Sequence, residues 1–199
     1  MSGKIKLNSA SGGGSVSIQA PSSSTNTRVM TLPDTADGTV LTTTNPKAGN
    51  IIQVVQYSTN NEVSSTSGSF VDSGLSGAIT TTGSNKVLVI VSQYYRHIRT
   101  TQAAGGGFRV LRGSTVIETD PTNSSNLPFG QYLYISGVSE INMYGRYCIE
   151  VLDTPSAGTH TYKTQMALNS TADSSQVRAQ YQASGENATS YLTLMEVAA

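Results

Sequence analysis

The chain has 199 residues, in which twelve basic residues balance twelve acidic ones, so its formal net charge is zero. Because binding to nucleic acid or to an anionic membrane needs a clustered excess of Lys and Arg, this balance argues against both partners. The single cysteine, Cys148, excludes an internal disulfide and any multi-cysteine metal site. With neither a signal-peptide pattern nor an apolar run of about 20 residues, we expect synthesis in a cytoplasm and no membrane insertion.

Residues 1–49 contain four short apolar segments separated by Pro, Ser, Thr, Asn and Gly. Each segment offers too little apolar area to offset backbone ordering at about 1 to 2 kcal/mol per residue. We therefore expect these extended segments to dock on a partner chain, since the alternative, disorder, favours fewer β-branched residues and more charge. The docking side chains are Ile5, Leu7, Val16, Ile18, Val29, Leu32, Val40 and Leu41.

Residues 50–199 show the two-residue alternation of β-strands and almost no helical periodicity. The even positions from Tyr162 to Leu168 form one face of a half-buried strand. The same alternation over 176–183 places Tyr181 on the inward face of a second strand and Gln180 on its outward face. Turn signals divide this region into about eight strands between Ile51 and Val197. The predicted fold is an all-β, antiparallel, jelly-roll-like sandwich that follows the extended N-terminal strands.

The segment 87–91 is apolar at every position, which predicts a central strand covered on both faces. A facing sheet would cover one face, and another subunit or a loop would cover the other. Because one sandwich of about 150 residues supplies too little cover for this strand and its Tyr-rich neighbours, we expect a homotrimer.

The sequence carries no signature of an enzyme, so we expect no catalytic residues, no cofactor and no metal. A G-x-S-x-G nucleophile motif does not occur. His97 and His160 are far apart, and neither has a second His or Cys at ligand spacing. The Gly105–Gly107 run lacks the Lys and Ser/Thr of a phosphate-binding loop, which favours a tight turn instead.

Glu118 and Asp120 would share one face of a strand, as the carboxylate pair of a glycosidase or a calcium site does. Their position just before Pro121 favours a solvated strand end instead. Cys148 lies on a predicted strand with no neighbouring group that would lower its pKa, so we interpret it as a packed small residue.

Two groups of residues suggest a recognition surface, because tyrosine rings stack and their hydroxyls form hydrogen bonds. The same rings would equally suit packing along a subunit interface, and the sequence leaves both interpretations open. The first group is Tyr94, Tyr95, Arg96, His97 and Arg99, and the second is Tyr132, Tyr134, Asn142 and Tyr144.

The stretch SVSIQAPSSSTNTRVMTLPDTADGTVLTT, which begins at Ser15, resembles a segment of tail-fibre and related virion proteins of tailed bacteriophages. The later stretches SGLSGAITTTGSNKVLVIVSQ, FRVLRGSTVIETD and SYLTLMEVAA are similar to a C-terminal β domain of such phages. The resemblance covers nearly the whole chain but rests on turns and strand ends. It implies a virion component with a trimeric jelly roll of the tumour-necrosis-factor type, tethered by its N-terminal segment to other phage structural proteins.

Three functions follow as hypotheses. The first is a short trimeric tail fibre or spike that docks through residues 1–49 and binds a host surface glycan. The second is a capsid decoration or head-fibre protein with a purely structural role, since the tether and the C-terminal domain lie nearly adjacent in the chain. The third is a polysaccharide-cleaving tailspike, for which Glu118 would be the best candidate acid.

Overall fold

A computed structural model confirms the antiparallel all-β class, because every regular element in its described residues is a β-strand. The structure describes residues 4–19, 22–23, 25, 27, 46–122, 127–181 and 188–199. The chain divides into two units, Met1–Val40 and Leu41–Ala199. Within the described ranges, no helix is long and apolar enough to span a membrane.

The described part of the first unit forms a hairpin of β1 (Lys4–Asn8) and β2 (Ser15–Gln19), which pair antiparallel. Gly12 and Gly13 in the connecting loop have φ angles of +85° and +70°, which glycine adopts without a Cβ clash. Their sequence predicts that these segments dock on another chain. They pair with each other because the glycine-rich loop reverses the chain within a few residues.

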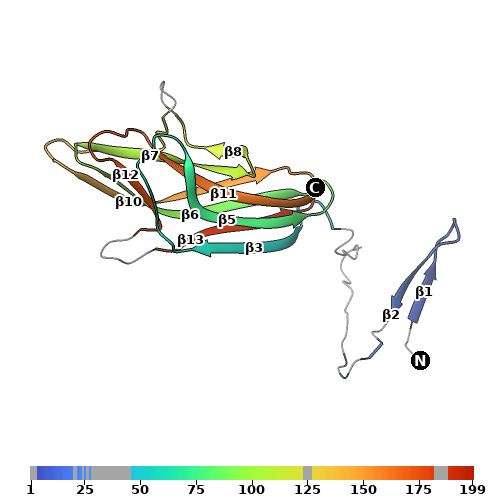
Figure 1. Ribbon diagram of the computed structural model, residues 1–199. Helices are drawn as coiled ribbons and strands as arrows, with labels where there is room; N and C mark the ends of the chain where they lie inside the picture. The colour runs from blue at the N-terminus through green and yellow to red at the C-terminus, as the bar shows by residue number, and fades with distance from the viewer. Residues whose placement is uncertain are drawn as a thin grey trace. The chain divides into compact units, whose positions relative to one another are not determined.

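The second unit is a sandwich of two antiparallel sheets, one of six strands and one of five. Figure 1 shows the strands of this unit in two layers. Its strands are β3 (Ile51–Thr59), β4 (Val63–Ser65), β5 (Val71–Thr81), β6 (Lys86–Arg99), β7 (Ala103–Arg112), β8 (Thr115–Thr119), β9 (Gln131–Tyr134), β10 (Ile141–Asp153), β11 (Gly158–Leu168), β12 (Gln176–Ala179) and β13 (Ser190–Val197).

Eight of these strands follow the order of a jelly roll. In the six-stranded sheet they run β3-β13-β6-β10, and in the five-stranded sheet β5-β11-β7-β8. Numbered along the chain, these orders are 1-8-3-6 and 2-7-4-5, which is the double Greek key of a jelly roll. The short strand β12 pairs with β6 and β4 pairs with β12 in the six-stranded sheet, and β9 pairs with β7 in the other. The sequence prediction of about eight strands therefore matches the principal ones.

Two-residue alternation builds the core between the sheets, as the sequence predicted for β11. Tyr162, Thr164, Met166 and Leu168 are all at most 1% exposed and face the interior. In β6 the interior positions are Val87, Val89 and Val91, whereas Leu88 and Ile90 lie half-buried on the opposite, outer face of the six-stranded sheet. The facing sheet therefore covers one side of β6, as expected.

Polar side chains connect the two sheets across this core. Arg112 of β7 and the Tyr162 hydroxyl of β11 both donate to Asp153 of β10, at 2.5 and 2.8 Å. Thr164 of β11 donates to the Gln93 side chain of β6 at 2.5 Å. Since buried polar groups cost free energy unless they are paired, these bonds also help to select one relative position of the sheets.

The Gly105–Gly107 run lies inside strand β7, so the tight turn predicted for it is wrong. A Cβ added at Gly106 would lie 2.3 Å from the Ala167 carbonyl oxygen of β11 and 2.6 Å from the His97 Cε1 atom. A Cβ at Gly107 would lie 2.6 Å from Pro128. The glycines therefore permit close approach of neighbouring groups to the strand rather than a reversal of the chain.

Candidate functional site

The alternation of β6 divides the first predicted cluster between two faces of its sheet. Tyr95 and His97 are buried in the core, at 7% and 0% exposure, so their interpretation as surface contacts is wrong. Tyr94 and Arg96 lie on the outer face. Every second side chain of β6 faces the core, beginning with Val87, Val89 and Val91. This alternation continues to position 97, so the His97 side chain also faces the core.

His97 packs among aromatic rings within the sandwich. Its ring centroid lies 5.0 Å from that of Tyr95 and 6.4 Å from that of Phe108. Burial lowers the pKa of His97 to about 3, because the charged imidazolium would lose its hydration. Neither ring nitrogen has a hydrogen-bond partner among the described residues. His97 is thus a neutral core residue at neutral pH.

Strand β10 brings part of the second predicted cluster onto the same outer face. The register places Tyr144 opposite Arg96 and Arg146 opposite Tyr94. Arg96 donates from Nε and Nη2 to the Oδ1 atom of Asn142, at 2.9 and 2.5 Å. Asn142, Tyr144 and Arg96 therefore belong to one surface, although the sequence assigned them to two groups.

Strand β12 and the residues that follow it add Arg178 and Tyr181 to this outer face, neither of which the sequence placed in a recognition cluster. Arg178 lies directly opposite Arg96 in the ladder. Beyond β12, Gln180 has a φ angle of +60° and is fully buried, although the predicted alternation placed it with the outward residues. This left-handed residue interrupts the alternation, so that Tyr181 lies against the guanidinium groups of Arg96 and Arg178.

These residues form a continuous surface of stacked cations and rings on the outer face of the six-stranded sheet. Arg96 lies over two rings, at 5.3 Å from the Tyr144 centroid and 4.8 Å from that of Tyr181. Arg178 lies 4.8 Å from the same Tyr181 ring, and Arg146 lies 5.4 Å from Tyr94. We name this surface the Arg/Tyr face, and its members are Tyr94, Arg96, Tyr144, Arg146, Arg178 and Tyr181.

The charges of the Arg/Tyr face are only partly compensated. Arg178 makes an ion pair with Glu62 at 3.3 Å. Arg146 donates to the Ser92 hydroxyl at 3.1 Å and to the Thr189 carbonyl at 3.3 Å, both of which are neutral acceptors. Within the described ranges, neither Arg96 nor Arg146 forms an ion pair with a carboxylate. The Asn142 side chain that accepts from Arg96 donates in turn to the Glu140 carboxylate. The three guanidinium groups therefore face two carboxylates, Glu62 and Glu140, and an excess of positive charge remains on this face.

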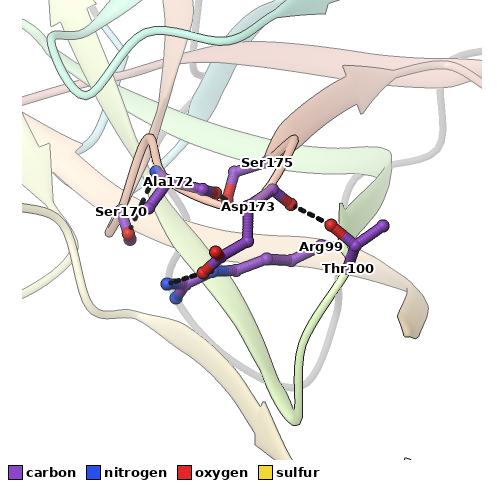
Figure 2. A network of polar contacts seen from close by, with 6 residues as sticks. All are labelled: Arg99, Thr100, Ser170, Ala172, Asp173 and Ser175. Atoms are coloured by element: carbon purple, nitrogen blue, oxygen red, sulfur yellow. Dashed lines mark hydrogen bonds and ion pairs between the residues drawn. The ribbon is translucent and has the colours of Figure 1, made fainter. Parts of the chain in front are cut away.

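Arg99, which the sequence placed in the recognition cluster, instead holds a neighbouring loop. Its Nη2 atom forms an ion pair with Asp173 at 2.8 Å, and the Thr100 amide and hydroxyl donate to the Asp173 carbonyl. Figure 2 shows the Arg99–Asp173 pair and the Thr100 hydroxyl bond together with the neighbouring Ser175 and Ala172. These bonds fix a turn in which Asp173 has a φ angle of +54°. Arg99 therefore has a structural partner.

The remaining tyrosines of the second cluster lie in the other sheet. Tyr132 and Tyr134 belong to β9, which pairs with β7, and they are 44% and 58% exposed. Tyr132 stacks on Phe129 at 4.7 Å, and the Tyr134 hydroxyl donates to Gln102 at 3.0 Å. The structure therefore does not bring them together with Asn142 on one sheet.

The carboxylates considered for catalysis have local structural partners. Asp120 accepts bonds from the Phe108 amide at 2.7 Å and the Gln131 side chain at 2.9 Å, so it links β7 to the first residue of β9. Glu118 accepts from the adjacent Thr119 amide. In the part of the chain that the structure describes, no group of three or more His, Cys, Asp or Glu residues is placed to hold a metal.

Cys148 is exposed, so its interpretation as a packed residue is wrong. It lies opposite Ser92 in the β6–β10 ladder, between the apolar part of the outer face and the Arg/Tyr face. Cys148 faces outward because its neighbour Tyr147 faces the core and successive side chains of β10 alternate between the two faces.

The hairpin gathers the first four predicted docking residues on one side. Ile5 lies opposite Ile18 and Leu7 opposite Val16, and the four side chains are 52–69% exposed. Because side chains alternate along a strand, both pairs share a face. The other predicted docking residues, Val29, Leu32, Val40 and Leu41, lie outside the described residues.

No protein-family model matches the chain, and no curated protein is significantly similar to it. Function is therefore inferred from the Arg/Tyr face and from the hairpin. Sequence reasoning missed Arg146, Arg178 and Tyr181 because the strands that carry them are far apart in the chain. The sequence did indicate that Arg178 faces outward, because it stands between two small apolar residues, Val177 and Ala179.

Proposed function

We propose that the chain is a structural component of a phage virion, a short trimeric tail fibre or spike that docks by its N-terminal segment and binds a host surface glycan. The observation that carries this proposal is the Arg/Tyr face, an outward surface of rings and hydrogen-bond donors on a jelly-roll unit. Such surfaces suit recognition, because stacked rings offer contact area at little entropic cost.

The hairpin supports the docking role. An isolated two-stranded hairpin is marginally stable in water, and this one exposes all four apolar side chains of its paired face. Covering that face with another virion protein would bury Ile5, Leu7, Val16 and Ile18 together. The opposite face carries Lys4 and Lys6, which suit contact with solvent or with acidic groups.

The outer face of the six-stranded sheet supports trimer formation. A row of apolar side chains crosses four strands in register, with Val54 opposite Met195, Met195 opposite Leu88, and Leu88 opposite Leu152. Val54 and Leu152 are each 51% exposed. A subunit packed on this row would bury apolar area at about 25 cal/mol per Å².

A capsid decoration or head-fibre role is the second candidate. It is favoured by the short span between the end of the hairpin at Gln19 and the first sandwich strand at Ile51, which leaves little chain for a shaft. In that role the hairpin would clamp neighbouring capsid proteins, and the sandwich would cover the capsid surface.

Quantitative mass spectrometry of purified particles, with sedimentation of the free protein, tests the proposal. A fibre predicts at most a few tens of copies per virion and a sedimenting trimer at micromolar concentration. Hundreds of copies per virion would instead support the decoration role. A stable monomer, or absence of the protein from particles, would contradict the trimeric fibre.

A further inference from the structure

We propose that the Arg/Tyr face binds an acidic saccharide, one that carries carboxylate or sulfate groups, rather than a neutral glycan. This inference rests on the proposed function and names the class of its ligand. The Arg/Tyr face combines two properties that such a ligand would use, guanidinium groups whose charges are only partly compensated and the exposed ring of Tyr144.

The first argument is the charge arrangement. Arg96 and Arg178 occupy directly opposite positions of neighbouring strands, where like charges destabilise a sheet. Both guanidinium groups also lie 4.8 Å from the centroid of the same Tyr181 ring, so the two cations share one aromatic neighbour. Glu62 pairs with Arg178, whereas Arg96 has only the neutral Asn142 amide as a hydrogen-bond acceptor. An anion bound beside Arg96 would offset the charge that Glu62 does not compensate.

The second argument is the state of the donors. Arg96 uses Nε and Nη2 on Asn142, and its Nη1 atom has no acceptor among the described residues. The Tyr144 and Tyr181 rings contact the same guanidinium at 5.3 and 4.8 Å and thereby restrict its orientation. A positioned guanidinium loses less entropy on binding, and its bonds to a carboxylate or sulfate are charge-assisted.

The third argument distinguishes a saccharide from a free inorganic anion. Tyr144 is 42% exposed, so its ring offers an apolar face beside the cations. Sugar rings present C–H groups that pack on such faces, whereas phosphate or chloride gains nothing from them. The register of β6 and β10 sets Arg146 beside this region, opposite Tyr94, so that an extended chain could meet a third cation.

Binding of the full-length protein to defined polymers tests the proposal. The probes are polygalacturonate for carboxylates, dextran sulfate for sulfates, neutral dextran, and a single-stranded oligonucleotide of matched charge, each measured by isothermal titration calorimetry. We expect one or both acidic polysaccharides to bind, and the carboxylate and sulfate arms identify which acidic group is used. We expect neutral dextran not to bind, and the oligonucleotide to bind more weakly.

Three variants assign this binding to the Arg/Tyr face. Arg96→Gln and Arg178→Gln should each weaken binding by about ten- to a hundredfold, the usual effect of losing one charge-assisted contact. Tyr144→Ala should weaken polysaccharide binding and leave binding of inorganic sulfate unchanged. Arg109→Gln is the matched control, because Arg109 also stacks on a ring, Phe70 at 4.3 Å, but belongs to the other sheet. It should bind like the wild type.

Several results would overturn the inference. These are no binding to either acidic polysaccharide, stronger binding to dextran or to the oligonucleotide, or equal losses in the Arg96→Gln and Arg109→Gln proteins. Circular dichroism of each variant separates lost binding from lost folding. Trimer formation and copy number per virion do not depend on these results, so the fibre proposal can fail or stand independently of the ligand class.

Discussion

Acidification should destabilise the sandwich through His97 before it affects the carboxylates. Burial lowers the pKa of this histidine from 6.5 to about 3 in the folded protein. The unfolded chain therefore binds a proton near pH 6.5, while the folded protein does not until near pH 3. Because the unfolded state holds more protons between these values, the free energy of unfolding falls as the pH decreases.

The structure allows the size of this loss to be estimated. Each pH unit between the two pKa values costs up to about 1.4 kcal/mol, so acidification from pH 7 to pH 5 should cost about 2 kcal/mol. In a domain of this size that loss corresponds to a fall in Tm of about 4 to 8 °C. Glu196, whose pKa is lowered by hydrogen bonds from Thr82, Asn85 and Gln53 although burial opposes this, loses its contribution only below about pH 4.5.

Urea unfolding followed by circular dichroism at pH 7, 6 and 5 measures the effect. The His97→Leu protein should show a much flatter dependence, since leucine has similar volume and binds no proton. His160→Gln is the control, because it removes the other histidine, which lies outside the core, and it should keep the wild-type dependence. Equal pH dependence in the wild-type and His97→Leu proteins would refute the assignment, as would constant stability of the wild type from pH 7 to pH 5.

Three further outcomes are expected. Glu196→Gln should cost about 2 kcal/mol in urea unfolding, because its carboxylate accepts four hydrogen bonds and an amide would turn a donor toward donors, while Glu118→Gln should cost little. Gly106→Ala should cost about 2 to 3 kcal/mol, since the added methyl would lie 2.3 Å from the Ala167 carbonyl oxygen and 2.6 Å from the His97 ring, and an unchanged Tm would contradict that packing. Deletion of residues 1–44 should leave a folded sandwich that no longer joins the virion, and a variant that still assembles into particles would exclude N-terminal docking.

The two-residue alternation of apolar and polar residues in the sequence by itself determined the fold class and the core positions of several strands. A strand turns each successive side chain to the other face, so local patterns indicated that Tyr162 and Met166 face the core together. The same local rule identified Ile5, Leu7, Val16 and Ile18 as apolar positions of short N-terminal strands. These conclusions need no knowledge of which strands are neighbours.

Tertiary structure alone decided which residues share a surface. The pairing of β6 with both β10 and β12 brings Arg146 and Arg178 beside Arg96, although they are 50 or more positions away in the chain. The left-handed conformation of Gln180 reverses the alternation and turns Tyr181 outward, which no two-residue period predicts. Long-range register and one backbone dihedral angle thus assemble the Arg/Tyr face, because cross-strand neighbours are set by hydrogen-bond pairing between distant segments rather than by adjacent sequence.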